Sequence, residues 1–181
     1  PEQIATLVKG VADACREVGC ALLGGETAEM PGVYQPGEID LAGTIVGVVN
    51  RPQLIDGSRI QQGDLILGLP STGLHTNGYS LARSILADLD WTTPHPALGC
   101  SIGDALLQVH RCYLPEVQKL WNAGVDIRGL AHITGGGITD NLPRIFPEGI
   151  GAVIRHKAWP VPPIFTLIQE LGGVPDEQML H

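Results

Sequence analysis

The sequence predicts a globular protein of mixed helices and strands, in the α/β or α+β class. Hydrophobic residues make up 44% of the 181 positions and charged residues only 17%, which is typical of a chain that buries a core. The 24 glycines and 14 prolines indicate many tight turns. Segments with helical periodicity alternate with short apolar segments that are rich in β-branched residues.

The first part of the chain carries one helical pattern and two strand-like patterns. Apolar residues recur at helical spacing over residues 4–18, and Gly19 ends the predicted helix. Residues 20–23 indicate a short buried strand, and residues 39–49 a longer strand that bends at its glycines. Turn residues cluster at residues 50–57, so we expect a domain boundary there.

The rest of the chain continues the alternation of the two patterns. Short apolar runs predict strands at residues 64–69, 127–133 and 151–154. Helical spacing predicts helices over residues 81–89, from Asp104 onward, and over residues 115–121, 141–145 and 164–171. Ser80 is the expected N-cap of the first of these helices.

Charge and cysteine content exclude several classes of partner. The net charge of −8 argues against binding to nucleic acid or to an anionic membrane, so a phosphate ligand would have to be held locally by backbone N–H groups. The 4 cysteines form no Cys-x-x-Cys pair and no tight Cys/His cluster, which argues against zinc and indicates reduced thiols in the cytoplasm. No apolar run reaches membrane-spanning length.

The first candidate site is a glycine turn with two carboxylates at Gly24–Gly32. A predicted strand runs into Gly24 and Gly25, which let the backbone turn sharply and approach a ligand closely. Glu26 and Glu29 follow, and carboxylates beside a phosphate ligand usually act through Mg²⁺. Taken alone, the motif is explained more simply as an ordinary turn with solvated glutamates.

The second candidate site is the polar loop Ser71–Ser80, which follows a predicted strand. It places hydroxyl groups, an amide and an imidazole around glycines. His75 can serve as a general acid or base, or donate to a phosphate, because its pKa is easily tuned across neutrality. A structural histidine bonded to the backbone of its loop explains the pattern equally well.

The third candidate site is His132–Asn141, in which Gly135–Gly137 lead from a predicted strand into a helix. Free N–H groups and the helix dipole favour an anion at such a turn. The spacing matches neither the Walker loop nor the Gly-x-Gly-x-x-Gly dinucleotide motif. A glycine-rich turn that is needed only for packing is the simpler alternative.

The remaining histidines and the tryptophans are interpreted as structural or solvated. The histidines in this group are His95, His110, His156 and His181. The tryptophans lie far apart in the sequence and are not interleaved with basic residues, which favours packing over base stacking at Trp91, Trp121 and Trp159. The chain contains no Gly-x-Ser-x-Gly nucleophile elbow.

Taken together and in this order, the three loops resemble those of the aminoimidazole ribonucleotide synthetase (phosphoribosylformylglycinamidine cyclo-ligase) family. The resemblance runs almost throughout the chain, and its most specific part is the run Gly19–Gly32. The further matching segments are Gly47–Val49, Ile55–Gly57, Gly73–Leu81, His132–Gly137 and Asn141–Arg144.

The resemblance implies a fold of two α+β domains and a homodimer formed through the N-terminal domain. Residues 1–54 correspond to the second half of that ATP-binding domain, and residues 55–181 to a C-terminal domain truncated at its end. The chain begins without Met and lacks the family's Asp-Gly-x-Gly-x-Lys motif and its Phe-Asn-x-Gly segment. We therefore expect an internal fragment with an incomplete ATP site, and poor solubility or non-native association because its cut edge exposes core surface.

The reaction that the resemblance implies is the closure of formylglycinamidine ribonucleotide to aminoimidazole ribonucleotide in purine biosynthesis, with ATP and Mg²⁺. The implied nucleotide-binding residues are Gly24, Gly25, Glu26 and Thr27, with Glu26 also the Mg²⁺ ligand. The implied catalytic residues, in a cleft between the domains, are His75 and Asn77. The residues implied to hold a phosphate, that of the ribonucleotide, are Thr134, Gly135, Gly136 and Gly137.

Two alternatives stay open at this point. Other ATP-using enzymes of the same superfamily have related folds, among them formylglycinamidine ribonucleotide synthetase and selenophosphate synthetase, although the run Glu26–Gly32 favours the cyclo-ligase. A non-catalytic remnant that binds nucleotide or dimerises without turnover is the second alternative. An Asp-Gly-x-Gly-x-Lys motif immediately before Pro1 would decide for the enzyme.

Overall fold

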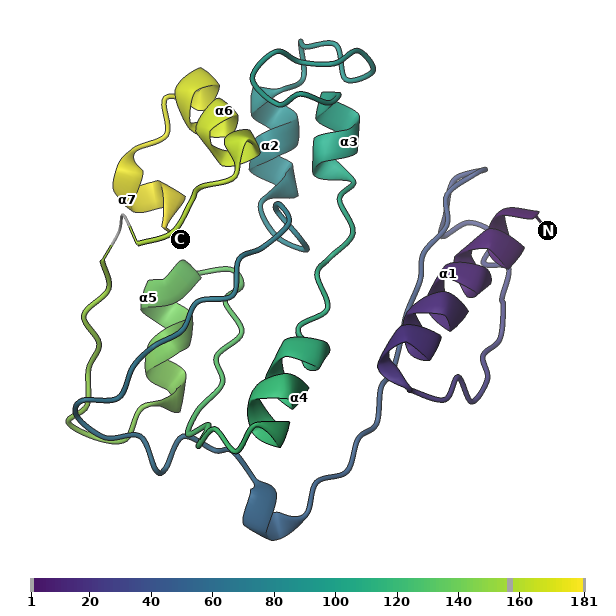
Figure 1. Cartoon of the computed structure of the whole chain (residues 1–181). Coiled ribbons are helices and arrows are strands. Elements are labelled where there is room, and N and C mark those ends of the chain that lie inside the picture. Colours follow the sequence, from purple (N-terminus) through teal and green to yellow (C-terminus); the bar gives the residue numbers. More distant parts are fainter. Residues whose placement is uncertain (1, 156–157, 181) are drawn as a thin grey trace. The chain divides into compact units, whose positions relative to one another are not determined.

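The computed structural model describes residues 2–155 and 158–180, and the chain divides into two compact units, Pro1–Leu54 and Ile55–His181 (Figure 1). The first unit holds helix α1 (Glu2–Val18) and the 3-10 turn η1 (Arg51–Gln53). The helices of the second unit are α2 (Tyr79–Ile85), α3 (Ile102–Leu106), α4 (Leu114–Asn122), α5 (Gly137–Asn141), η2 (Leu142–Ile145), α6 (Pro163–Gly172) and α7 (Asp176–Met179). The assignment of these units to the two family domains stays a prediction.

Helix α1 forms where the spacing of apolar residues predicts a helix. It ends at Gly19, whose φ of 68° is a left-handed conformation that glycine adopts without strain. Asp13 accepts hydrogen bonds from Lys9 at 2.5 Å and from Arg16 at 2.8 Å, one helical turn away on either side. None of the residues described in α1 is buried, so its apolar stripe is only partly covered.

Helices α2, α3 and α6 build the core of the second unit. Helix α2 contacts α6, and Figure 1 shows α3 beside α2. The buried apolar side chains that meet there are Ala82, Leu86, Ile102, Ala105, Leu106, Ile164, Leu167 and Ile168. Trp91 packs against this cluster and donates its Nε1–H to the Leu86 carbonyl at 2.8 Å, which agrees with its interpretation as a packing residue.

The starts of α2 and α3 differ from the sequence-based expectation. The N-cap of α2 is Gly78, with a φ of 88°, so the prediction that Ser80 caps this helix is wrong. A glycine in the left-handed conformation lets the chain enter the helix two residues earlier. Helix α3 begins at Ile102 because the Ser101 hydroxyl accepts a hydrogen bond from the Asp104 N–H at 3.0 Å.

The apolar segments predicted as strands do not pair into a sheet. Within residues 2–155 and 158–180, the only β-bridges are two isolated ones, between Pro31 and Tyr34 and between Pro94 and Ser101. The predicted strands that lack ladder partners are 20–23, 39–49, 64–69, 127–133 and 151–154. An apolar, β-branched composition indicates that a segment favours burial. A β-strand also requires a neighbouring strand that pairs with its backbone N–H and C=O groups, and composition does not identify that neighbour. Several of these side chains are correspondingly exposed, with Val48 at 100% and Val153 at 93%.

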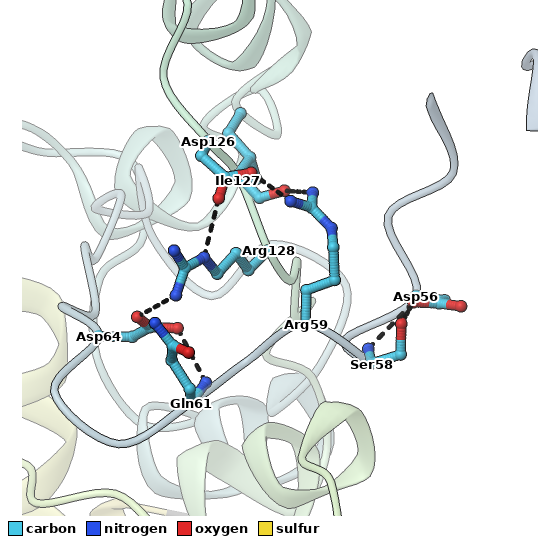
Figure 2. Close-up of polar contacts among 8 residues, drawn as sticks. All are labelled: Asp56, Ser58, Arg59, Gln61, Asp64, Asp126, Ile127 and Arg128. Carbon is cyan, nitrogen blue, oxygen red and sulfur yellow. Dashed lines mark hydrogen bonds and ion pairs between the residues drawn. The ribbon is translucent and has the colours of Figure 1, made fainter. Parts of the chain in front are cut away.

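A chain of alternating charges joins two of these extended segments in the second unit (Figure 2). Arg128 donates to Asp126 at 2.9 Å and to Asp64 at 2.7 Å, and Arg59 donates to Asp126 and to the Ile127 carbonyl. These guanidinium groups lower the pKa of the Asp126 carboxyl, with Arg128 the larger cause and Arg59 the smaller. The network fixes the start of residues 64–70 beside the start of residues 127–134.

No helix in the described residues is long and apolar enough to cross a membrane. The longest described helix, α1, has 17 residues and carries charged side chains along its length.

A substitution at Gly57 tests whether the start of the second unit packs closely against the backbone of Ile145. A Cβ added there would lie 2.1 Å from the Ile145 carbonyl oxygen, and the φ of Gly57 is 84°. Gly63 has a similar φ of 95° but open space around it, so Gly63→Ala isolates the backbone strain of about 1–2 kcal/mol. We expect Gly57→Ala to lower the free energy of unfolding by roughly 1–3 kcal/mol more than Gly63→Ala does. Denaturant unfolding of both variants measures the difference, and equal losses would show that the Gly57–Ile145 approach does not form.

Candidate functional site

The second and third candidate loops meet in the second unit. The Asn77 side chain donates from Nδ2 to the Thr134 hydroxyl at 2.6 Å. The Asn77 Oδ1 atom also faces Gly135, because a Cβ added to that glycine would lie 3.5 Å from it. Loops 57 residues apart in sequence are therefore held together by an amide and a hydroxyl that the sequence singled out.

The core of the unit anchors the loop that carries Asn77. Leu74 and Tyr79, on either side of the polar residues, both pack against the buried cluster of α2, α3 and α6. The Tyr79 hydroxyl donates to the Leu106 carbonyl at 2.7 Å. Since both ends of the segment are fixed, His75 and Asn77 are presented on a short turn whose position depends on the core.

His75 has an unusual backbone conformation within that turn. Its φ of 60° makes it the one non-glycine residue in the described chain with a left-handed backbone. The turn is closed by the Asn77 N–H, which donates to the Leu74 carbonyl at 3.4 Å. A non-glycine residue in this region is strained and persists only when its surroundings hold it, a pattern that is common at functional sites.

Three histidines and a tyrosine gather around this turn, and we call them the histidine cluster: His75, His110, Tyr113 and His132. The ring of His110 lies against that of His75, with centroids 3.8 Å apart and planes inclined by 30°. His132 lies 6.1 Å from His110, and Tyr113 lies 6.3 Å from both His75 and His110. No group of three or more His, Cys, Asp or Glu residues in the described chain is arranged to hold a metal ion.

His110 and His132 alter the proton affinity of His75. Burial lowers the pKa of His75 below its ordinary value, and the positive charges that His110 and His132 would carry lower this pKa further. The interpretation of His110 as merely structural or solvated therefore missed its contact with His75. No local sequence signal links the two residues, because they come from separate segments that only the fold brings together. Of the other histidines in that group, His156 and His181 lie outside the described residues.

The segment that carries His110 is attached to the end of residues 64–70. The guanidinium of Arg111 donates to the Pro70 carbonyl at 3.4 Å and to Glu116 at 2.8 Å. The Tyr113 hydroxyl donates to the same Pro70 carbonyl at 3.3 Å. Arg111 is thus paired with Glu116 and lowers the pKa of that carboxyl, and its guanidinium also lies 5.7 Å from the centre of the Tyr113 ring.

The glycine turn of the third loop is shaped by Asn141 and Asp140. The buried amide of Asn141 donates to the carbonyls of Thr134, Gly135 and Gly137, at 3.3, 3.3 and 2.7 Å. The Asp140 carboxylate folds back over Gly136, where an added Cβ would lie 2.5 Å from Oδ2. The negative charge of Asp140 therefore disfavours an anion over Gly136, whereas Gly135 faces the neutral amide of Asn77.

The first candidate loop belongs to the other unit. Gly24 has a φ of 155°, which favours glycine, but residues 21–30 form neither a turn nor a bend, so the sharp turn predicted at Gly24 and Gly25 is wrong and the segment is extended. Glu26, Thr27 and Glu29 follow in an exposed segment with open space around Gly25. Their side chains are free to meet a ligand, and the structure describes them only within this unit.

Comparison with known proteins gives a family for both units. Residues 61–181 match the family model described as AIR synthase related protein, C-terminal domain, and residues 1–49 match AIR synthase related protein, N-terminal domain. The chain belongs to the AIR synthase related protein family.

The chain is also similar to curated relatives named phosphoribosylformylglycinamidine cyclo-ligase. The relative from Desulfitobacterium hafniense (strain DSM 10664 / DCB-2) is 53% identical over 181 residues, which cover 100% of this chain and 53% of that protein. Those from Gloeobacter violaceus and Shouchella clausii are 51% and 48% identical, over 99% and 100% of this chain. The chain spans about half the length of the curated relatives that it matches.

A double-mutant cycle tests the bond that joins the two loops. Thr134→Val removes the hydroxyl while keeping the shape, and Asn77→Ala removes the amide that donates to it. We expect the two changes to be coupled by about 0.5–1.5 kcal/mol in the free energy of unfolding, the usual net value of such a hydrogen bond. Thr134→Ser keeps a hydroxyl and should preserve most of the coupling. Additive single effects would show that the loops are not joined by this bond.

The effect of His110 on His75 can be measured by titration. We expect His110→Asn to raise the pKa of His75 toward its ordinary value, because the change exposes the ring and removes a neighbouring charge. NMR titration of the His75 ring measures this shift, and His95→Asn, outside the histidine cluster, is the control. An unchanged His75 pKa in His110→Asn would contradict the stacked arrangement.

The lowered pKa of His75 determines whether the free energy of unfolding rises or falls with pH. The folded pKa of His75 lies below its unfolded value, so the unfolded chain binds more protons between the two values. The free energy of unfolding should therefore fall as the pH is lowered through about 6.5, the ordinary histidine pKa. This fall should be smaller in His110→Asn than in the unaltered protein.

Proposed function

We propose that the protein to which this chain belongs closes the imidazole ring of formylglycinamidine ribonucleotide, using ATP and forming aminoimidazole ribonucleotide, ADP and phosphate. The observation that carries this proposal is the similarity of the whole chain, at about half of all positions, to proteins named phosphoribosylformylglycinamidine cyclo-ligase. The meeting of the Asn77 and Thr134 loops supports it, since it gathers polar groups of two predicted site loops in one place.

The chemistry explains why ATP is needed. An amide carbon is a poor electrophile and its oxygen is a poor leaving group. Transfer of the γ-phosphoryl group of ATP to the formamide oxygen gives an iminophosphate and releases ADP. A nitrogen of the same substrate then attacks the carbon, the C–O bond breaks, and phosphate leaves. The protein's task is mainly to position the groups and to stabilise the charge on phosphoryl oxygens.

In the second unit, Thr134, Gly135, Gly136 and Gly137 are proposed to hold the phosphate of the ribonucleotide. The N–H groups of Gly135 and Gly136 donate to no other atom in the described chain, whereas the Gly137 N–H already donates to the Thr134 carbonyl at 2.9 Å. The position of Asp140 favours binding on the Gly135 side. His75 and Asn77, on the adjoining turn, are proposed to contact the reacting part of the substrate.

In the first unit, Gly24, Gly25, Glu26 and Thr27 are proposed to bind the nucleotide, with Glu26 as a ligand of Mg²⁺. The residues fit this role, because Mg²⁺ is usually held by one or two carboxylates together with substrate phosphates and water. A bound Mg²⁺ would supply charge stabilisation at the phosphoryl oxygens. The chain's own contribution is an exposed carboxylate next to two glycines with open space around them, which a phosphate can approach.

Three wider features belong to the same proposal. The whole protein is proposed to have two α+β domains, with residues 1–54 in the N-terminal one and residues 55–181 in the C-terminal one. It is proposed to be a homodimer and to act in the cytoplasm. Two observations support the two-domain arrangement. The chain belongs to the family, and its two matching segments are separate, because the first ends at residue 49 and the second starts at residue 61.

An assay of the full-length protein tests the function. We expect ADP and aminoimidazole ribonucleotide to form in equal amounts when ATP, Mg²⁺ and formylglycinamidine ribonucleotide are all present. Omission of the ribonucleotide should abolish ADP release. Turnover of ATP with another acceptor, but not with this ribonucleotide, would reject the cyclo-ligase in favour of another enzyme of the superfamily.

The same assay separates the two glutamates of the first loop. Glu26→Gln removes the proposed Mg²⁺ ligand and should raise the Mg²⁺ concentration needed for half-maximal rate by roughly tenfold or more, equivalent to about 1.4 kcal/mol. Glu29→Gln, three residues along in the same exposed segment, is the matched control and should change this value little. A larger effect at Glu29 would reverse the metal assignment.

A further inference from the structure

The hydrogen bonds of His75 determine which of its ring nitrogens carries a proton. The backbone N–H of Thr72 donates to His75 Nε2 at 3.1 Å, and the backbone N–H of Arg111 points to the same atom at 3.5 Å. A backbone N–H can only donate, so Nε2 must present its lone pair. The proton of the neutral imidazole then lies on Nδ1.

The Thr72 hydroxyl is compatible with this assignment. It lies 2.9 Å from His75 Nε2 and 2.8 Å from the Val109 carbonyl oxygen, which can only accept. A hydroxyl has one proton and turns it to either acceptor, whereas the direction of an amide N–H is fixed by the backbone. The amide of Thr72 therefore decides the protonation of Nε2.

The surroundings of the ring also favour its neutral form. His110 donates from Nδ1 to the Arg111 carbonyl at 2.9 Å, and its ring lies 3.8 Å from that of His75. A proton placed on His75 Nε2 would oppose the Thr72 N–H and would put a positive charge beside a second imidazole. In contrast, His75 Nδ1 donates to no atom within residues 2–155 and 158–180, which leaves this N–H for a ligand.

We propose that His75 serves the site as a neutral hydrogen-bond donor through Nδ1–H, with its tautomer set by the backbone of Thr72, and that it transfers no proton. The acceptor is a negatively charged phosphoryl oxygen of the bound substrates. The identity of this acceptor rests on the proposed cyclo-ligase function, whereas the tautomer does not. A neutral donor stabilises negative charge without changing its own protonation during the reaction.

The tautomer is measured directly by NMR on the full-length protein labelled with ¹⁵N-histidine. Long-range ¹H–¹⁵N correlation distinguishes the nitrogens because the Hδ2 proton couples strongly to Nε2 and weakly to Nδ1. Above the pKa of the ring, we expect the nitrogen that couples to Hδ2 to be the unprotonated one. The His75 signals are identified by their loss in His75→Asn. A protonated Nε2, or an averaged mixture of tautomers, would overturn the proposal.

Thr72→Val is the matched control for the source of the constraint. This change removes the hydroxyl and leaves the backbone N–H in place. We expect the same tautomer of His75 in this variant. A switch to the Nε2–H form would show that the hydroxyl, and not the amide, sets the tautomer.

Two substitutions of His75 itself test the donor role in turnover. An asparagine places an amide N–H near the position of Nδ1, and a glutamine reaches the position of Nε2. We expect kcat/KM of His75→Asn to exceed that of His75→Gln by roughly tenfold or more, the usual effect of one hydrogen bond to a charged group. Equal values, or the opposite order, would overturn the donor role. Absence of ring closure in the unaltered protein, with the expected tautomer present, would instead reject the cyclo-ligase function alone.

Discussion

The hydrogen bond between Asn77 and Thr134 is the interaction on which the candidate site depends. Without it, the loop at residues 71–80 and the glycine turn at residues 134–137 would be separate surface features of the second unit. A charge network supports the contact between the two loops, because it holds the segments that lead into them side by side. The network consists of Arg59, Asp126, Arg128 and Asp64. Both segments run in the same direction from these ion pairs toward the loops, since Asp64 pairs with Arg128 and Asn77 with Thr134.

The site also depends on a core that contains none of its polar residues. Leu74 and Tyr79 hold the ends of the His75 turn against α2, α3 and α6, and the strain at His75 is balanced by these contacts. A change in the core is therefore expected to reach the site through the position of this turn. The proposed nucleotide loop at Gly24–Thr27 has no comparable support, because no described residue of the first unit is buried.

The sequence predicted the helices better than it predicted the strands or the contacts between loops. Helix α1, and α4 with its proline in the first turn, follow from local spacing, which is a property of neighbouring residues. Segments such as residues 39–49 were predicted as strands from apolar, β-branched composition, but pairing depends on partners that composition does not specify. The contact of His110 with His75 was missed for the same reason, since it forms only when residues 109–113 lie against the loop of His75.

A common physical principle links the loops of this site. The chain has a net charge of −8, and the basic residue nearest the histidine cluster, Arg111, is already paired with Glu116. The groups proposed to meet a phosphate are therefore neutral donors: the amides of Gly135 and Gly136, and His75 Nδ1–H. Neutral dipoles that are fixed by the fold stabilise an anion without requiring a basic surface, and they would not reorganise when charge moves between oxygens in the proposed phosphoryl transfer. An acidic protein can bind phosphorylated substrates in this way, and a charged His75 would be less suited to the site, because its Nε2 proton would displace the Thr72 amide that orients the ring.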